Sequence, residues 1–158
     1  MITEEDRKLF QEAFDKSVRG ILAQGRKSYE TGGCAYRGED GCKCAIGQLI
    51  PDEEYDPLFE CLSVEGLRKQ YGFEKRINIP SLSPFFDGDR FPDKEGSQFL
   101  ARLQHAHDYA LTSNFKGRDE SFVGSFKKKV AELGTVYGLD LSVLEEKMGS
   151  SVSHPGDC

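Results

Sequence analysis

Apolar side chains recur every three or four residues in three long stretches of the chain, and this period predicts three long helices. The first stretch begins at Thr3, a residue suited to a helix N-cap, continues with three acidic residues and stops at Gly25. The second follows Gly96, and the third spans residues 119–138. We expect the apolar stripes of these helices to supply most of the core.

The segment after the first helix has no helical period at its start. Two short mixed segments, residues 29–37 and 42–46, flank Asp40-Gly41. An Asp-Gly pair between short segments is typical of a β-hairpin. The sequence therefore predicts an α+β fold that is mostly α, with about three long helices, several short ones and a small β-hairpin inserted after the first helix.

The length of 158 residues suits one domain with its own core. We expect residues 1–148 to form this domain, and residues 149–158, which combine Ser, Gly and Pro, to form a flexible C-terminal tail. Residues 73–96 contain three prolines and no clear period. A loop of this length in a compact domain is typically functional or mobile.

Acidic residues outnumber basic ones, and the formal net charge is −6. A protein that binds the phosphate backbone of a nucleic acid needs clustered Lys and Arg, so the charge argues against a nucleic-acid partner. A small anionic ligand remains compatible with this charge, because such a ligand needs only a few local cations.

No apolar run approaches the roughly 18 residues of a membrane span, and the acidic N-terminus lacks the features of a secretory signal. We therefore expect a cytoplasmic protein with no membrane partner. The five cysteines are an odd number, and a reducing compartment argues against a disulfide framework.

Three closely spaced cysteines raise the possibility of a metal site. Together with His105 or His107, Cys34, Cys42 and Cys44 would provide a tetrahedral set of zinc ligands. Structural zinc sites usually pair cysteines that are separated by roughly two to four residues, whereas a single residue separates Cys42 from Cys44. We expect no metal or other cofactor, with zinc at these three cysteines as the alternative.

A reactive thiol is a second chemical interpretation of the same segment. Cys44 precedes a short apolar run and follows Lys43, and a thiolate beside a cation at a helix N-terminus has a lowered pKa. His105 or His107 would then serve as the base, and Asp108 would orient it. This constellation would support a cysteine-dependent hydrolase or transferase.

Ligand capture is the third interpretation. Tyr36, Arg37 and Lys43 lie on the two arms of the predicted hairpin, among several glycines that leave backbone amides open to close approach. Arg and Lys would hold a phosphate or carboxylate, and Tyr36 would stack on a ring. Further candidate ligand-binding cations are Arg76, Arg90 and Arg102.

Two blocks of sequence carry a resemblance. Tyr36-Arg37 is followed by residues 41–50, Gly-Cys-Lys-Cys-Ala-Ile-Gly-Gln-Leu-Ile, and later by residues 103–108, Leu-Gln-His-Ala-His-Asp. These blocks resemble those of small uncharacterised bacteriophage and bacterial proteins with a Tyr-Arg pair, a Lys-Cys-Ala-(Ile/Val)-Gly-x-Leu-Ile block and a downstream Leu-Gln…His-Asp block. Cys42 has no counterpart in that pattern, which weakens the zinc alternative. The resemblance implies a phage-type accessory protein that acts on host defence or takeover.

The resulting first hypothesis is a non-enzymatic phage-type protein in the host cytoplasm. It would bind a small anionic, nucleotide-like ligand and so sequester a host defence signal. The alternatives are the cysteine-dependent hydrolase or transferase described above, and a zinc-stapled interaction module that inhibits a host protein. The sequence gives neither the host partner nor the oligomeric state.

Overall fold

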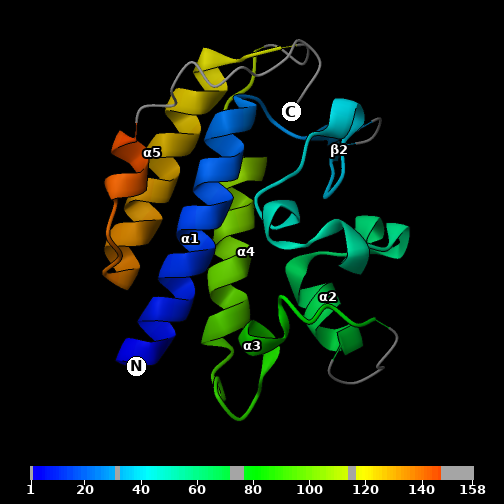
Figure 1. Cartoon of the computed structure of the whole chain (residues 1–158), viewed down its shortest axis with the longest axis vertical. Helices are drawn as coiled ribbons and strands as arrows, with labels where there is room; N and C mark the ends of the chain where they lie inside the picture. The colour runs from blue at the N-terminus through cyan, green and yellow to red at the C-terminus, as the bar shows by residue number, and fades with distance from the viewer. Residues whose placement is uncertain (1, 31–32, 72–76, 114–116, 147–158) are drawn as a thin grey trace.

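The computed structural model describes residues 2–30, 33–71, 77–113 and 117–146 (Figure 1). The tail predicted at 149–158 and the candidate ligand residue Arg76 lie outside these ranges. None of the described helices is long and apolar enough to cross a lipid bilayer.

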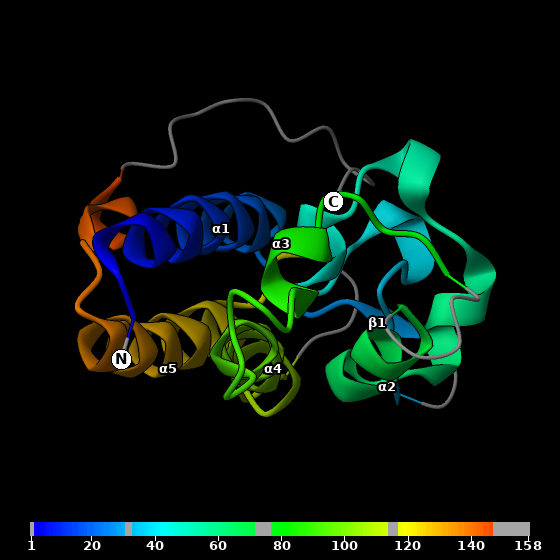
Figure 2. The same ribbon diagram turned by 90° about the horizontal axis from the view of Figure 1, so that it is seen from below.

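Three long helices form one side of the molecule. They are α1 (Glu4–Gln24), α4 (Glu95–Asp108) and α5 (Glu120–Tyr137), and each packs against the other two (Figures 1 and 2). All three correspond to the stretches of helical period in the sequence, so these helix predictions are confirmed.

The ends of α1 and α5 follow the capping chemistry that the sequence predicts. The Thr3 hydroxyl accepts a hydrogen bond from the Asp6 amide at 3.0 Å, and the Asp6 carboxylate accepts one from the Thr3 amide at 3.0 Å. Gly25 and Gly138 end α1 and α5 with φ values of 71° and 67°, a left-handed conformation that glycine adopts without strain.

Aromatic rings fill the core where the first half of α1 meets the start of α4 and the end of α5. The rings of Phe10 and Phe99 stack in parallel with centroids 4.5 Å apart, and Tyr137 meets Phe10 edge-on at 5.5 Å. Phe85, from the short helix α3 (Ser83–Phe86), lies near-parallel to both rings, with its centroid 6.0 Å from that of Phe10 and 6.3 Å from that of Phe99. Burial of each such ring stabilises the fold by roughly 1.5–3 kcal/mol, so this cluster joins four helices into one core.

Short elements form the other side of the molecule, between α1 and α4 in sequence (Figure 2). They are β1 (Tyr29–Glu30), β2 (Gly33–Cys34), η1 (Glu39–Gly41), η2 (Gly47–Leu49), η3 (Asp52–Glu54), η4 (Pro57–Cys61) and α2 (Val64–Lys69). A further short element, η6 (Ser142–Glu145), follows α5 and packs on α1.

The predicted α+β class and its hairpin were wrong, because the described chain is essentially helical. Strands β1 and β2 are two residues long and pair only with each other. The two arms expected at 29–37 and 42–46 share a single isolated bridge, between Arg37 and Lys43. Between them the chain turns through η1, where Asp40 has a φ of 57°.

Two buried side chains explain why no ladder forms between these arms. The Gln24 amide accepts from the Lys43 N–H at 2.8 Å and donates to the Lys43 carbonyl at 3.0 Å. The Ser28 hydroxyl donates to the Ala35 carbonyl at 2.7 Å. Backbone groups that a hairpin would pair across the strands are thus satisfied by side chains from the end of α1 and the segment after it.

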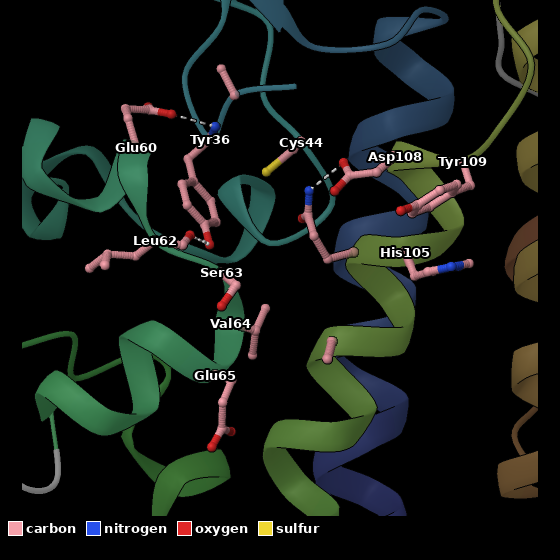
Figure 3. A pocket seen from close by; sticks show the side chains of 13 residues that line it. Tyr36, Cys44, Glu60, Leu62, Ser63, Val64, Glu65, His105, Asp108 and Tyr109 are labelled. Carbon is pink, nitrogen blue, oxygen red and sulfur yellow. Dashed lines mark hydrogen bonds between the residues drawn. The ribbon is translucent and has the colours of Figure 1, made fainter. Parts of the chain in front are cut away.

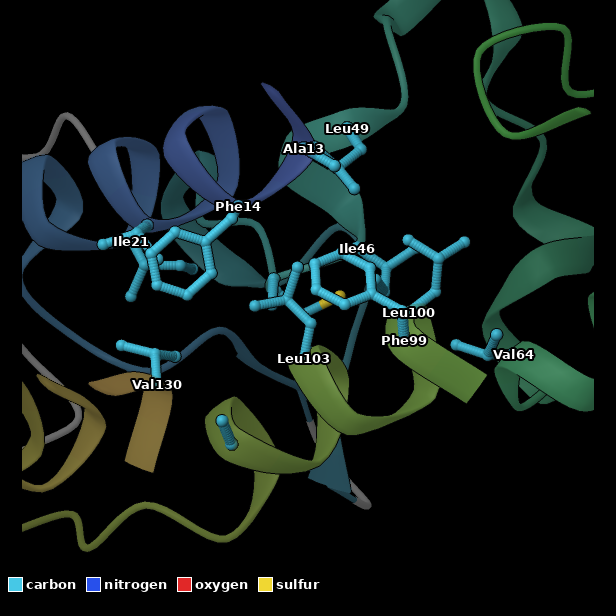
Figure 4. Close-up of a cluster of buried hydrophobic side chains, with 14 of the residues drawn as sticks. Ala13, Phe14, Ile21, Ile46, Leu49, Val64, Phe99, Leu100, Leu103 and Val130 are labelled. Carbon is cyan, nitrogen blue, oxygen red and sulfur yellow. The ribbon is translucent and has the colours of Figure 1, made fainter. Parts of the chain in front are cut away.

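Residues 44–50, which we call the plug, connect the side formed by the long helices to the side formed by the short elements. Ile46 and Leu49 point into the core between α1 and α4 (Figure 4). The Ser17 hydroxyl donates to the Ala45 carbonyl at 2.7 Å, which ties the plug to α1. Gly47 passes so close to Tyr36 that an added Cβ would lie 2.2 Å from the Tyr36 carbonyl oxygen, so no larger residue fits there.

Candidate ligand-binding pocket

A pocket of about 280 Å³ opens between α4 and the short elements facing it (Figure 3). One wall comes from α4 and the residue after it, and the other from the Ala35–Tyr36 segment and from residues 60–65. The lining residues are Ala35, Tyr36, Cys44, Glu60, Leu62, Ser63, Val64, Glu65, Ala101, Gln104, His105, Asp108 and Tyr109.

The α4 wall follows from helical spacing. Ala101, Gln104, His105 and Asp108 recur three or four residues apart, so they share one face of the helix. Ala101 leaves space in the pocket because its side chain is a single methyl group. His105 is exposed and its ring stacks on Tyr109 with centroids 4.1 Å apart.

The opposite wall is held by Tyr36 and Glu60. The Tyr36 hydroxyl donates to the Leu62 carbonyl at 2.6 Å, and burial raises the pKa of this phenol well above its ordinary value. The Glu60 carboxylate accepts from the backbone amides of Tyr36 at 2.9 Å and Arg37 at 3.0 Å, and also from the Tyr55 hydroxyl. Glu60 is therefore a structural carboxylate, and both of its oxygens already accept hydrogen bonds.

The floor of the pocket is a hydrogen-bonded network that starts at His107. Its ring is completely buried, and its Nε2 accepts from the Ser28 amide at 3.1 Å. Since Nε2 must therefore carry a lone pair, the ring proton lies on Nδ1, which is 2.9 Å from Asp108 Oδ1 and donates to it. Burial lowers the pKa of His107 despite its contact with Asp108, so the ring is neutral.

Gln104 extends the network to the plug. Its side-chain nitrogen donates to Asp108 Oδ1 at 2.7 Å, and its side-chain oxygen accepts from the Ile46 amide at 3.0 Å. Asp108 Oδ1 thus receives two N–H donors, from His107 and Gln104. Among the described residues, no donor reaches Asp108 Oδ2, and the side chain is about one-third exposed (31%).

Cys44 lies in the pocket floor but is fully buried (Figure 3). Its sulfur accepts from the Gly47 amide at 3.3 Å, and burial, reinforced by the nearby Asp108 charge, raises the pKa of the thiol to about 12. Within the described chain, no hydrogen bond joins Cys44 to His105 or His107. The structure gathers Cys44, His105 and Asp108 around one pocket without the thiol–imidazole contact that nucleophilic catalysis requires.

The cations proposed for ligand capture lie in different places. Arg37 donates to the carbonyls of Gly47 at 2.8 Å and Ile50 at 2.6 Å, and its guanidinium lies over the Tyr55 ring. Lys43 and Arg37 both reach the exposed Asp52. Arg37 therefore holds the plug in its bent path, and neither cation lines the pocket.

Arg90 and Arg102 are far from this group in the fold. Arg90 donates to the Asp6 carboxylate at 2.8 Å at the start of α1. Arg102 lies over the Tyr137 ring and lines a separate hollow of about 440 Å³ together with Arg7 and Glu95. Of the described residues proposed for ligand capture, only Tyr36 lines the pocket beside α4.

The alternative of a zinc site has no support in the described residues, because no three of their His, Cys, Asp or Glu side chains lie close enough together to hold a metal ion. The Cys34 side chain is outside the description. Cys42 takes part in a disulfide, so the expectation of a chain without disulfides does not hold at this residue. Its partner lies outside the described side chains.

Sequence reasoning did not assign a site role to Gln104, Glu60 or Ser28. A signal existed for Gln104, because it stands four residues before Asp108 in a predicted helix, a spacing at which amide and carboxylate side chains bond. The roles of Glu60 and Ser28 depend on contacts with residues distant in sequence. Comparison of the chain with protein-family models, curated proteins and solved structures finds no match.

Replacement of Arg37 by Ala should destabilise the protein without acting on the pocket itself. Loss of the guanidinium leaves the Gly47 and Ile50 carbonyls without their donor, and we expect a loss of about 2–3 kcal/mol in the free energy of unfolding. Urea denaturation measures this. The matched control is Arg19→Ala, which removes an exposed ion pair with Glu146 and should cost clearly less than Arg37→Ala, because solvent screens such a pair. Equal costs for the two variants would contradict the structural role of Arg37.

Cys44 should resist alkylation in the folded protein. A buried thiol with a pKa near 12 is almost wholly protonated at pH 8, and only the thiolate reacts with iodoacetamide. Peptide mapping by mass spectrometry should show Cys44 labelled only after unfolding in urea. Rapid labelling of Cys44 in the native protein at neutral pH would restore the cysteine-enzyme alternative.

His107 should make folding stability depend on pH. Because the pKa of His107 is lowered in the folded state, the unfolded chain takes up the proton first, near its ordinary value of about 6.5. The contribution of His107 to the free energy of unfolding is fully present above about pH 6.5. It declines as the pH falls below this value, by at most about 1.4 kcal/mol per pH unit. Urea denaturation between pH 5 and pH 8 measures the slope.

The exposed His105 supplies the control for this slope. The His105→Gln variant should still lose stability below about pH 6.5. In the His107→Gln variant, the part of this loss that is due to protonation of His107 should disappear. If His105→Gln flattens the profile and His107→Gln does not, the buried ring is not the titrating group.

Proposed function

We propose that this chain is a binding protein and that its ligand enters the pocket between α4 and residues 60–65. One observation carries this proposal: the pocket has a polar floor that is already assembled around Asp108, one of whose oxygens is open. Asp108 is fixed by two N–H donors on Oδ1, while Oδ2 has no donor among the described residues. Preorganised polar groups in a mostly apolar cavity are the usual arrangement of small-ligand sites.

The same geometry argues against an enzyme at this pocket. The Cys44 thiol is protonated, and the Nε2 atom of His107 is occupied by the Ser28 amide. His105 is the remaining base candidate, and it stacks on Tyr109 at the surface with no contact to the Cys44 sulfur. Binding therefore accounts for the pocket better than a cysteine-dependent transfer or hydrolysis does.

The biological setting that we propose is that of a phage-type accessory protein in the host cytoplasm, with a small ligand or a host protein as partner. The Tyr36-Arg37, 41–50 and 103–108 blocks support this setting by their resemblance to such proteins. The disulfide of Cys42 counts against the cytoplasm as the location, because cytoplasmic thiols are kept reduced.

The sequence predicts an anionic ligand, but the charges around this pocket disfavour an anion. Among the described residues, its lining includes the carboxylates of Glu60, Glu65 and Asp108 and no Lys or Arg side chain. A phosphate placed here would meet negative charge at short range. A nucleotide-like anion is therefore not the ligand that this pocket favours.

An anion site elsewhere is the second candidate. The hollow lined by Arg7 and Arg102 carries two guanidinium groups, and Arg7 Nε is a buried nitrogen with no hydrogen-bond acceptor in the part of the chain that the structure describes. Glu95 in the same hollow offsets part of this positive charge. A nucleotide-like ligand that binds this chain should bind here.

Ala101→Trp should test the pocket, because an indole at this exposed position of α4 would fill the space above Gln104. A library of metabolites, amines and nucleotides is screened by ¹⁵N NMR of the wild-type protein. Ligands that shift the Gln104 side-chain amide should lose at least tenfold in affinity for Ala101→Trp.

The matched control is Ser121→Trp, which places the same indole at an exposed position of α5 and should bind as the wild type does. Unchanged binding to Ala101→Trp would contradict the pocket proposal. Shifts confined to residues around Arg7, and abolished by Arg102→Ala, would favour the anion site instead.

A further inference from the structure

We infer that the pocket beside α4 selects a small protonated amine carried on a short apolar or aromatic body. This inference rests on the proposed binding function and adds the chemical class of the ligand. It starts from the three carboxylates that line the pocket and asks which of them is open to a ligand.

Two of the three carboxylates are already committed. Glu60 receives the amides of Tyr36 and Arg37 and the Tyr55 hydroxyl. Glu65 accepts from the Arg68 guanidinium through both of its oxygens, at 2.6 and 2.9 Å. Their charges contribute to the field in the pocket, but each of their oxygens already accepts at least one hydrogen bond.

Asp108 is the open carboxylate. Gln104 and His107 both donate to Oδ1, which fixes the plane of the group, and Oδ2 has no donor among the described residues. Lys27 is the nearby cation, and its ammonium donates to the backbone carbonyl of Asp108 at 2.8 Å. Among the described residues Lys27 forms no ion pair with the Asp108 carboxylate, so Oδ2 is left to a ligand, although the positive charge of Lys27 offsets part of the negative charge of Asp108.

The remaining walls define the body of the ligand. Methyl, isopropyl and isobutyl groups come from Ala35, Ala101, Val64 and Leu62, and a phenol face comes from Tyr36. A cation buried against such walls needs a charged acceptor to offset its lost hydration, and Asp108 Oδ2 provides it. A ligand with an apolar body and one donor-only head matches this arrangement.

The size of the pocket limits the ligand further. Its volume of about 280 Å³ lies just below the roughly 300–1,000 Å³ that is usual for sites of drug-sized molecules. A single ring with a short alkylamine arm is of the right size, whereas a nucleotide is too large to be enclosed.

The test compares three probes that share one body. Phenethylamine carries the ammonium, 2-phenylethanol is its neutral counterpart, and phenylacetate is the anion. ¹⁵N NMR titrations of the Gln104 side-chain amide give the affinity of each probe at the pocket. We expect the amine to bind at least tenfold more tightly than the alcohol, and phenylacetate to bind more weakly than both.

Asp108→Asn is the decisive variant, because asparagine keeps an oxygen in the Oδ1 position for Gln104 and His107 and places an NH₂ group where Oδ2 lies. It should lower the affinity for phenethylamine to that of the alcohol and leave the alcohol unchanged. Asp93→Asn removes the same charge from an exposed loop outside the pocket and should alter neither affinity.

The outcomes separate the two claims. Equal binding of amine and alcohol, or an Asp108→Asn variant that still prefers the amine, would overturn the amine inference and leave the pocket proposal standing. Failure of all three probes and of the wider library to shift pocket residues would overturn the binding function together with it.

Discussion

The neutral imidazole of His107 is the contact on which the rest of the site depends. It is buried between α4 and the chain that leaves α1, and it uses both ring nitrogens, one toward the Ser28 amide and one toward Asp108. A protonated ring would lose the Ser28 bond, because both nitrogens would then be donors. The single tautomer therefore fixes the orientation of Asp108, and through Gln104 it fixes the plug at Ile46.

This network explains how an irregular segment has a defined path. The described residues between 26 and 62 contain little repetitive backbone pairing. Their backbone groups form hydrogen bonds with the side chains of Gln24, Ser28, Arg37 and Glu60, which lie 7 to 24 residues away in sequence. The result is a pocket wall that is rigid at Tyr36 without belonging to a sheet.

The long helices could be predicted from the sequence because their signals are local. The periodic apolar positions, the cap at Thr3 and the stop at Gly25 all lie within one element.

The hairpin prediction failed because the Asp-Gly signal at residues 40–41 describes only a turn. Strand pairing was prevented by Gln24 and Ser28, which no local pattern connects to residues 35–43. The Gly47 and Ile50 carbonyls to which Arg37 donates are likewise not visible in the sequence. Cys44, His105 and Asp108 were singled out as reactive side chains and do line one pocket, but burial and tautomer, which decide their chemistry, depend on the three-dimensional surroundings.

The most direct test of the central contact is long-range ¹H–¹⁵N NMR of the histidine rings at pH 7. We expect the His107 ring to be neutral, with Nδ1 protonated and Nε2 bare, and to keep this form well below the ordinary histidine pKa of about 6.5. A His107 ring with its proton on Nε2, or one that becomes doubly protonated near pH 6.5 in the folded protein, would contradict the network and the pocket built on it.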